Sequence, residues 1–487
     1  MLNKISGFLL IILLTSCASK KLTTDLTDNK STLIQSIDGH SGELIAMSDE
    51  IWALAETAFE ETKSSKILAD YAEAQGFRVE RGIIGIPTAF VASYGSGKPI
   101  IGILGEFDAL PGVSQKAVSN KDPLHEGAAG HGCGHNLFGA GSMGAAVAIK
   151  ELMEAGKLSG TIKYYGTPAE EKYFAKVFMA REGVFDELDA CLDWHPSAST
   201  KADVQSLLAL VDFTVEFHGQ AAHASIDPWN GRSASDALEL YTKGLNYYRE
   251  HIKPTSRIHY HIMDGGQVVN VVPDYAQIWT RVRDTKKLSM LEMYDRAKEI
   301  ARGAAVMAEV DYEIKLVSGL HDVLVNRAGG TALHKNLERL GDITYTPDEI
   351  QFAKNIQQAT GKKELGLDGI IRPLEPTREL LGGPSSDVGD ISWVVPQIRL
   401  GVTTAPINAP WHSWAVVACG GMSIGHKGLV YAAKALGMTM IDLFENPELI
   451  NQMQAEFKER KGDTVYKAIL PAGPPPIPQH ILDMDKE

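Results

Sequence analysis

The sequence predicts an α/β protein, a main mixed sheet with an inserted ferredoxin-like domain, from three observations. The chain has 487 residues, which is too long for one compact core. Strand and helix patterns alternate over residues 33–206, and α/β material resumes after residue 321. Between them, residues 207–321 follow the order β-α-β-β-α-β of the split βαβ unit. We therefore expect a discontinuous main domain, 33–206 and 322–470, interrupted by a second domain.

The first part of the main domain begins with a helical pattern and continues as alternating strands and helices. From 33 to 76 apolar residues recur at three- and four-residue steps, and the pattern stops at a glycine. Strands are expected at AFVASYG, PIIGILGEFDALPG, GTIKYYGTPAEE and ELDACLDWHP, and a helix at 139–154. In such sheets ligands gather beyond the carboxyl ends of the strands. Five polar residues are expected there: Glu106, Asp108, Glu170, Glu171 and His195.

The last part of the chain returns to the main domain. Helical patterns cover 332–339, 347–360 and the stretch SIGHKGLVYAAKALGMTMIDLFE. Residues 471–487 contain PAGPPPIPQH, which is expected to form an extended polyproline segment on the surface.

The N-terminus has the pattern of a secretory lipoprotein. An apolar run from Phe8 to Leu14 follows Lys4 and is too short to span a bilayer. It ends in LTSC, which resembles a bacterial lipobox, so residues 1–17 are expected to be a signal peptide with Cys17 as the lipid-bearing residue. Residues 18–32 would be a polar tether. The expected location is the bacterial cell envelope, with the body in the periplasm or on the cell surface; a plain secretory signal with an incidental cysteine is the alternative.

Composition excludes several classes of protein. The formal net charge of −14 argues against a nucleic-acid binder and against simple electrostatic docking to an anionic membrane. Any membrane contact would therefore come from the lipid on Cys17. Four cysteines are too few for a disulfide scaffold in a chain of this length.

The stretch GHGCGHN contains the most informative motif in the sequence. Cys133 and His135 lie two residues apart in a Gly-rich loop, where both side chains could be directed at one metal ion. Glu170 and Glu171 follow a strand, so one carboxylate could bind metal while its neighbour moves protons. The alternatives are a buried structural thiol and a solvated pair of carboxylates. His195 and His412, each taken alone, would more often be structural.

The motifs GEFDALPG, GHGCGHN, GTPAEE, DWHPS, HGQAAHAS and WHSW occur in this order, with the inserted domain between the fourth and the last. This set resembles the binuclear metallo-amidohydrolases and peptidases that include aminoacylases, indole-acetyl-amino-acid hydrolases and carboxypeptidases. The stretches DPWNGRSASDALEL, GGQVVNVVP, GPSSDVGDISWVVP and CGGMSIGHKGLVYAAK are most similar to the branch formed by the B-subunits of p-aminobenzoyl-glutamate hydrolase. The resemblance extends from about residue 35 to 465.

The resemblance implies two divalent metal ions per subunit, Mn²⁺ or Zn²⁺, with Glu170 as the general base. The implied metal ligands are Cys133, His135, Glu171, His195 and His412. Asp108 would orient a ligand histidine. Glu106 stands where many relatives have a histidine, so its role as a ligand or as a supporting residue is open.

The inserted domain would act as a lid or a dimerisation domain. The resemblance also implies that His223 reaches an active site, after domain closure or across a dimer interface, where we expect it to donate to the oxyanion. Weaker candidates for substrate contacts are Asn270, Arg232 and Asp387, for which a role as a turn or cap residue is the alternative.

The expected reaction is hydrolysis of an amide bond next to an amino-acid moiety, in an N-acyl-amino acid or p-aminobenzoyl-glutamate type of small molecule. The alternatives are a dipeptidase or aminopeptidase on the same fold, a lipoprotein that binds metal or ligand without catalysis, and a cysteine hydrolase using Cys133. We expect a homodimer, and a heteromeric complex with a separate partner subunit is the alternative.

Overall fold

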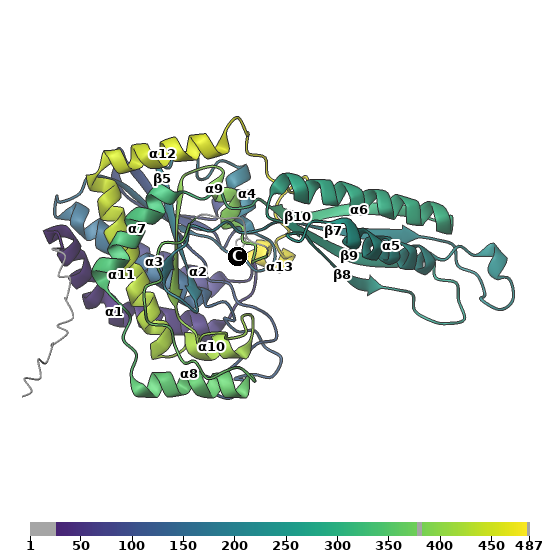
Figure 1. The fold of residues 1–487 in the computed structure, drawn as a ribbon, viewed down its shortest axis with the longest axis horizontal. Coiled ribbons are helices and arrows are strands. Elements are labelled where there is room, and N and C mark those ends of the chain that lie inside the picture. Colours follow the sequence, from purple (N-terminus) through teal and green to yellow (C-terminus); the bar gives the residue numbers. More distant parts are fainter. Residues whose placement is uncertain (1–25, 377–381, 485–487) are drawn as a thin grey trace, which may run out of the picture.

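The computed structural model describes residues 26–376 and 382–484 (Figure 1). The expected signal peptide and Cys17 lie outside these residues, as does most of the expected tether. In the described part of the chain, no helix combines the length and the apolar character needed to cross a bilayer.

A seven-stranded sheet forms the centre of the main body. Its strands are β1 (Arg78–Arg81), β2 (Phe90–Ser96), β3 (Ile100–Gly105), β4 (Gly160–Gly166), β5 (Ala190–Ser197), β6 (Lys201–Ala202) and β11 (Gln397–Thr403). They lie in the order β1-β2-β4-β3-β5-β11-β6. The neighbours β4, β3, β5 and β11 run parallel, and the outer pairs are antiparallel. The mixed sheet expected from the sequence is therefore confirmed.

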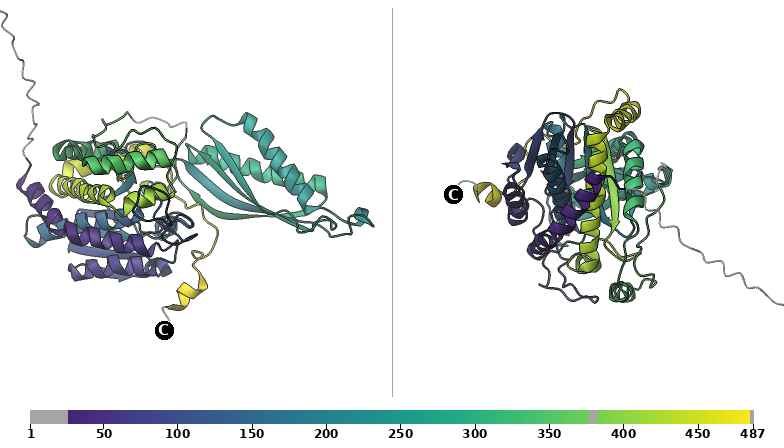
Figure 2. Two further views of the ribbon diagram at one scale, coloured as in Figure 1. Left: turned by 90° about the horizontal axis from the view of Figure 1, so that it is seen from below. Right: turned by 90° about the vertical axis from the view of Figure 1, so that its left-hand side faces the viewer.

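Helices cover this sheet and connect its strands (Figures 1 and 2). The helices outside the inserted domain are α1 (Asp28–Leu54), α2 (Thr62–Ala74), α3 (His135–Glu154), α4 (Ala175–Arg181), α7 (Arg327–Leu340), α8 (Pro347–Ala359), α9 (Val388–Ser392), α10 (Trp414–Gly420), α11 (Ser423–Glu445), α12 (Pro447–Lys461) and α13 (Gln479–Met484), with a 3-10 turn at Ile83–Gly85. Helices α3 and α11 pack on the central strands, and α1 packs on both of them. The small residues of α3 permit this close packing, since a Cβ on Gly144 would come within 2.5 Å of Leu44.

The inserted segment forms a second sheet with its own core and projects from the main body (Figures 1 and 2). Its elements are β7 (Ala209–His218), α5 (Ala234–Tyr248), β8 (Arg257–Asp264), β9 (Tyr275–Asp284), α6 (Lys287–Ala308) and β10 (Asp311–Leu320), with 3-10 turns at Pro228–Asn230 and Arg249–His251. The strands are all antiparallel, in the order β10-β7-β9-β8. Alternate residues of β7, such as Phe213 and Phe217, point into a core shared with α5 and α6. This is the β-α-β-β-α-β order expected from the sequence.

Some boundaries differ from the expectations. The helical pattern over 33–76 is two helices, because the chain turns at Ala55, which has a left-handed backbone with φ 45°. Helix α1 begins at Asp28, inside the expected tether, and its Lys30 is buried where it donates to Asn336 (2.9 Å) and Asp442 (2.5 Å). The Pro-rich tail ends in the short helix α13.

Candidate metal centre

The candidate ligands lie at one edge of the main sheet, where the parallel strands end. Glu106 and Asp108 follow β3, Glu170 and Glu171 follow β4, and His195 lies near the end of β5. Because parallel strands end at the same edge, these side chains converge although they are up to 89 residues apart. His412, in the loop after β11, completes the set.

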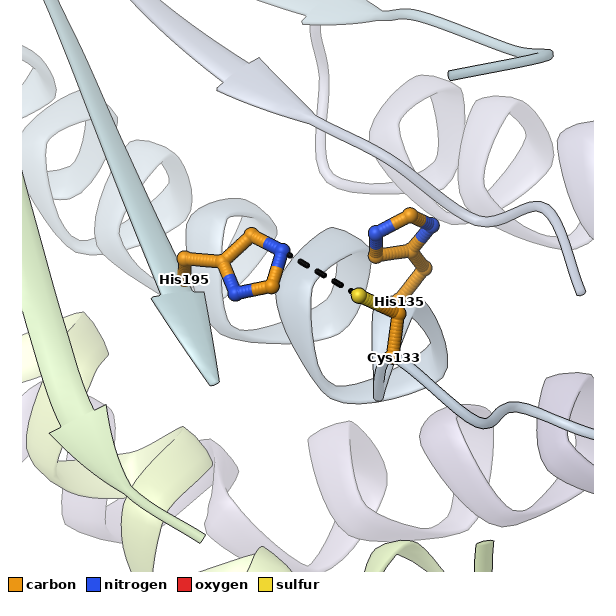
Figure 3. Close-up of side chains that lie close together, drawn as sticks. All are labelled: Cys133, His135 and His195. Carbon is orange, nitrogen blue, oxygen red and sulfur yellow. Dashed lines mark hydrogen bonds between the residues drawn. The ribbon is translucent and has the colours of Figure 1, made fainter. Parts of the chain in front are cut away.

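The loop before α3 positions Cys133 and His135 (Figure 3). Helix α3 begins at His135, four residues earlier than the sequence pattern indicated, and it is preceded by Gly134 with φ 78°. A Cβ on Gly134 would lie 3.0 Å from Pro196, so glycine is needed both for the backbone angle and for the space. The sulfur of Cys133 consequently lies 3.5 Å from Nε2 of His195.

Three groups of side chains have ligand atoms within 4.8 Å of one another, close enough to share a metal ion. They are Cys133 with His135 and His195, Cys133 with Glu171 and His412, and Glu106 with His135 and Glu170. The first two groups contain all five ligands implied by the resemblance, and Cys133 belongs to both. Nε2 of His412 lies 3.6 Å from Oε2 of Glu171.

The donor atoms of these groups fit divalent metal ions. Thiolate, imidazole and carboxylate ligands suit zinc and other first-row divalent ions. Oε1 of Glu171 is buried and has no hydrogen-bond partner in residues 26–376 and 382–484. A buried carboxylate oxygen without a partner is costly, and a metal ion would satisfy it.

Asp108 lies behind the first two groups and is fully buried. Its Oδ1 is 2.9 Å from Nδ1 of His135, and its Oδ2 accepts a hydrogen bond from the backbone N–H of Glu171 at 2.9 Å. With Nδ1 held in this way, Nε2 of His135 is directed at the site. These contacts are the ones that a carboxylate orienting a ligand histidine would make, and the orienting role of Asp108 stays a prediction.

Glu170 and Glu171 lie in an environment that opposes their ionisation. Burial, together with the charges of Glu106 and Glu171, raises the pKa of Glu170 well above its usual range. Burial also raises the pKa of Glu171 to about 7, while the charge of His135 opposes this shift. In this charge environment a bound cation would favour the ionised form of both groups.

The loop that carries the two glutamates is held by a residue that sequence reasoning missed. Ala169 has φ 58°, an unfavourable conformation for a residue with a side chain. Its backbone N–H donates to Oε1 of Glu61, which is fully buried after α1. No motif surrounds Glu61 in the sequence, so its role in holding the loop of Glu170 and Glu171 is visible only from its buried position in the structure.

Lys176 is the second residue that the sequence did not reveal. Its side chain is fully buried, with Nζ 2.8 Å from Oε1 of Glu106 and 2.7 Å from Oδ1 of Asp387. The other oxygen of Glu106 lies 3.0 Å from Nε2 of His135. Asp387 therefore lies behind the site as the partner of Lys176, and the sequence-based assignment of Asp387 to a substrate contact does not agree with this position.

The remaining predicted residues lie on the inserted domain and are not brought to the metal ligands within this chain. His223, Asn270 and Arg232 are exposed, in loops at the end of the domain remote from the main body (Figures 1 and 2). The backbone of Ala224 pairs with that of Asn270 at 3.1 Å, so the His223 and Asn270 loops are neighbours. Arg232 donates to Glu309 at 2.7 Å and to two backbone carbonyls.

Comparisons with known proteins agree with this architecture. Residues 102–351 match Peptidase family M20/M25/M40. The chain is 37% identical over 459 residues to the B-subunit of p-aminobenzoyl-glutamate hydrolase from Escherichia coli (strain K12), covering 89% of this chain and 95% of that protein. It is 30% identical over 445 residues to Xaa-Arg dipeptidase of Homo sapiens, covering 87% and 90%. A solved structure of a dinuclear metal binding peptidase from Bacillus subtilis has a TM-score of 0.58 at 18% identity and covers 84% of this chain and 99% of that one. The extent of these matches shows that the chain belongs to peptidase family M20/M25/M40.

Proposed function

We propose that this protein hydrolyses an amide bond next to an amino-acid moiety, in N-acyl-amino acids or conjugates of the p-aminobenzoyl-glutamate type, with two divalent metal ions. The observation that carries the proposal is the pair of three-ligand groups sharing Cys133, with Glu170 beside them and outside both. The relatives named for hydrolysis of p-aminobenzoyl-glutamate and of Xaa-Arg dipeptides support an amide bond as the target.

The metal ions would be held by Cys133, His135 and His195 in one group and by Cys133, Glu171 and His412 in the other. When bound, such a pair of ions polarises the scissile carbonyl and lowers the pKa of a water molecule. Sulfur and imidazole ligands favour zinc. The metal that is bound, zinc or manganese, also depends on the supply of each metal in the cell and on the coordination geometry of the site.

Glu170 would take the proton from the attacking water and give it to the leaving nitrogen. It is buried beside the ligands, within the group that it forms with Glu106 and His135. A carboxylate free of metal at this position suits a general base, because it can change its protonation during the reaction.

His223 would complete the site by donating a hydrogen bond to the oxyanion, from a second copy of the chain or after closure of the inserted domain. The exposed apolar side chains near it support an interface at this end of the domain. Trp229 is 72% exposed and Val269 is 98% exposed. We propose a homodimer, and the subunit naming of the Escherichia coli relative makes a second kind of subunit the alternative to test.

A lipid on Cys17 would hold the enzyme in the cell envelope of a bacterium. Labelling with radioactive palmitate should mark the wild-type protein and leave a Cys17→Ser variant unmarked. Label on neither protein would contradict the anchor.

A dipeptidase is the second candidate function, favoured by the 30% identity to Xaa-Arg dipeptidase. Purified protein should be stripped with a chelator, reloaded with Mn²⁺ or Zn²⁺, and assayed on p-aminobenzoyl-glutamate, acyl-amino acids and free dipeptides. We expect metal-dependent release of the free amino acid from the first two classes. Turnover of dipeptides alone would favour the second candidate, and no turnover of any amide by the metal-loaded protein would contradict both.

A further inference from the structure

The C-terminal segment crosses the junction between the main body and the inserted domain. Between α12 and α13 the chain forms no helix or strand over residues 462–478, and it runs past the base of the inserted domain (yellow in Figures 1 and 2). We name residues 466–477 the strap. The strap begins where the family resemblance ends, at about residue 465.

Polar contacts hold the first part of the strap at the base of the inserted domain. Oδ1 of Asp390 on α9 accepts a hydrogen bond from the hydroxyl of Tyr466 at 3.0 Å, and its Oδ2 accepts one from the backbone N–H of His321 at 3.0 Å. The side chain of His321, directly after β10, is fully buried, and its Nε2 donates to the carbonyl of Lys467 at 3.0 Å. A buried carboxylate and a buried imidazole therefore fix the strap where the inserted domain rejoins the main body.

Apolar side chains of the strap fill the junction itself. Ile469 packs against the core of the inserted domain, and a Cβ on Gly319 of β10 would lie 2.6 Å from it. Ala468 and Leu470 pack against a small buried cluster to which both domains contribute. Its members are Phe174 and Val177 of the main body and Leu210 and Leu320 of β7 and β10. The strap is therefore the third component of a core at the junction.

Phe174 belongs to the loop that carries Glu170 and Glu171. This loop is strained at both ends, since Ala169 has φ 58° and Phe174 has φ 59°. The backbone N–H of Phe174 donates to the carbonyl of Ala169 at 2.8 Å and so closes the loop. Farther along the strap, Ile477 packs against a second cluster, to which Ala169 belongs. The two clusters on which the strap packs thus contain both ends of the loop, and such backbone angles persist only where the surroundings enforce them.

We propose that the strap holds the loop of Glu170 and Glu171 against the base of the inserted domain, with Leu470 and Ile477 as positioning residues for the two carboxylates. The roles of Glu170 and Glu171 rest on the proposed function, whereas the packing of the strap does not. Loss of an apolar contact that supports a strained loop lets the loop open locally. A displacement of about 1 Å in a reacting group can lower a rate by about 10²-fold.

Hydrogen–deuterium exchange of the metal-free, full-length protein measures the mobility of this loop without turnover. Leu470→Ala and Ile477→Ala should each speed exchange in residues 168–176, which include the amide of Phe174, by about 10-fold. Exchange in the loop before α3 should stay at the wild-type rate. Val465→Ala is the matched control, since it shortens an apolar side chain that is 84% exposed just before the strap, and it should change neither loop.

The metal-loaded proteins test whether the loop has to be held for catalysis. Both alanine variants should lower kcat by about 10-fold and leave KM within about 2-fold, because the loop supplies the general base. Leu470→Met and Ile477→Leu conserve the volume and should restore both the exchange rate and kcat. If Leu470→Ala fails to fold, Ile477→Ala decides the matter, since Ile477 packs outside the junction core.

Three results would overturn the proposal. The first is unchanged exchange of residues 168–176 in the alanine variants. The second is equally faster exchange in the loop before α3, which would mean that the strap adds only general stability. The third is faster exchange of residues 168–176 with unchanged kcat. Faster exchange of these residues in a protein whose wild type hydrolyses no amide contradicts the proposed function alone, and hydrolysis with unchanged exchange contradicts this inference alone.

Discussion

The metal centre and the remote end of the inserted domain differ in how much of their environment the chain itself supplies. At the metal centre, side chains from the ends of β3, β4 and β5 and from the start of α3 are largely buried, and Asp108, Glu61 and Lys176 hold them or their loops in place. At the remote end, His223 is exposed, and its ring contacts only Ser225 among the interactions found in the described residues.

This difference fits two separate roles, metal binding in the first region and closure over the substrate in the second. A metal site has to be preorganised, because ligands that move lose affinity and geometry. A residue that closes over a substrate has to be absent from the site while the substrate enters. The candidate metal ligands are therefore brought together within one chain, whereas the proposed role of His223 would require movement or a second copy.

The largest effect is expected from Glu170→Gln. The substitution removes the proton acceptor and keeps the size of the side chain, so kcat should fall by about 10²- to 10⁴-fold. Elemental analysis should still find both metal ions, because Glu170 lies outside the two groups that share Cys133. Loss of metal in this variant, or full activity, would remove Glu170 from its proposed role.

Metal content distinguishes the shared ligand from the unshared ones. Cys133→Ala should weaken the binding of both metal ions, since the Cys133 sulfur belongs to both groups. Glu171→Ala should weaken mainly the binding of one ion. Stoichiometry measured by mass spectrometry of the native protein after dialysis reports this difference directly. If Cys133→Ala and Glu171→Ala give the same metal content, the sharing of Cys133 is wrong.

His223→Ala tests the region that the chain does not complete. Loss of an oxyanion donor should lower kcat by about 10²- to 10³-fold without changing metal content. If His223 acts in a second copy, co-expression with Glu170→Gln should restore activity to about a quarter of the wild-type level, because mixed dimers contain one intact site. Without restoration, His223 acts within its own chain or not at all.

The sequence revealed the two regions through different signals. Glu171 and His195 come in short motifs at strand ends, and the physics of parallel sheets places those ends together, so these two could be grouped from the sequence, whereas Cys133 and His412 joined the ligand set only through the family resemblance. The order of elements in the inserted domain followed from periodicity alone. Lys176 and Glu61 could not be found in this way. A lysine in AKVFMAR looks like a solvated side chain until tertiary packing buries it between the carboxylates of Glu106 and Asp387.

One substitution in each region, Lys176→Met at the metal centre and Arg232→Met at the remote end, compares how much an ion pair contributes to stability there. Lys176→Met removes the ammonium group that neutralises the buried carboxylates of Glu106 and Asp387, and the free energy of unfolding should fall by about 3–5 kcal/mol. Arg232→Met removes an exposed ion pair with Glu309 and should cost at most about 1 kcal/mol. Denaturant unfolding of the metal-loaded proteins measures both values. Equal costs would mean that Lys176 has no special structural role.

The smallest effect is a pH dependence confined to the metal centre. The pKa of Glu171 is raised to about 7 in the folded protein, above its ordinary value of 4.5, so the folded state holds this proton more tightly than the unfolded state does. Ionisation of Glu171 therefore costs the metal-free protein stability progressively as pH rises from about 4.5 to 7, by up to about 3 kcal/mol. In metal-free Glu171→Gln this cost is absent, so its unfolding free energy relative to wild type should increase from pH 5 to pH 7. His223→Gln, at the exposed end, should track the wild type over the same range within about 0.5 kcal/mol, as expected for a surface substitution. If the difference in unfolding free energy between Glu171→Gln and wild type does not change with pH, the environment of Glu171 does not disfavour its ionised form, and the argument that a metal ion would compensate this charge fails.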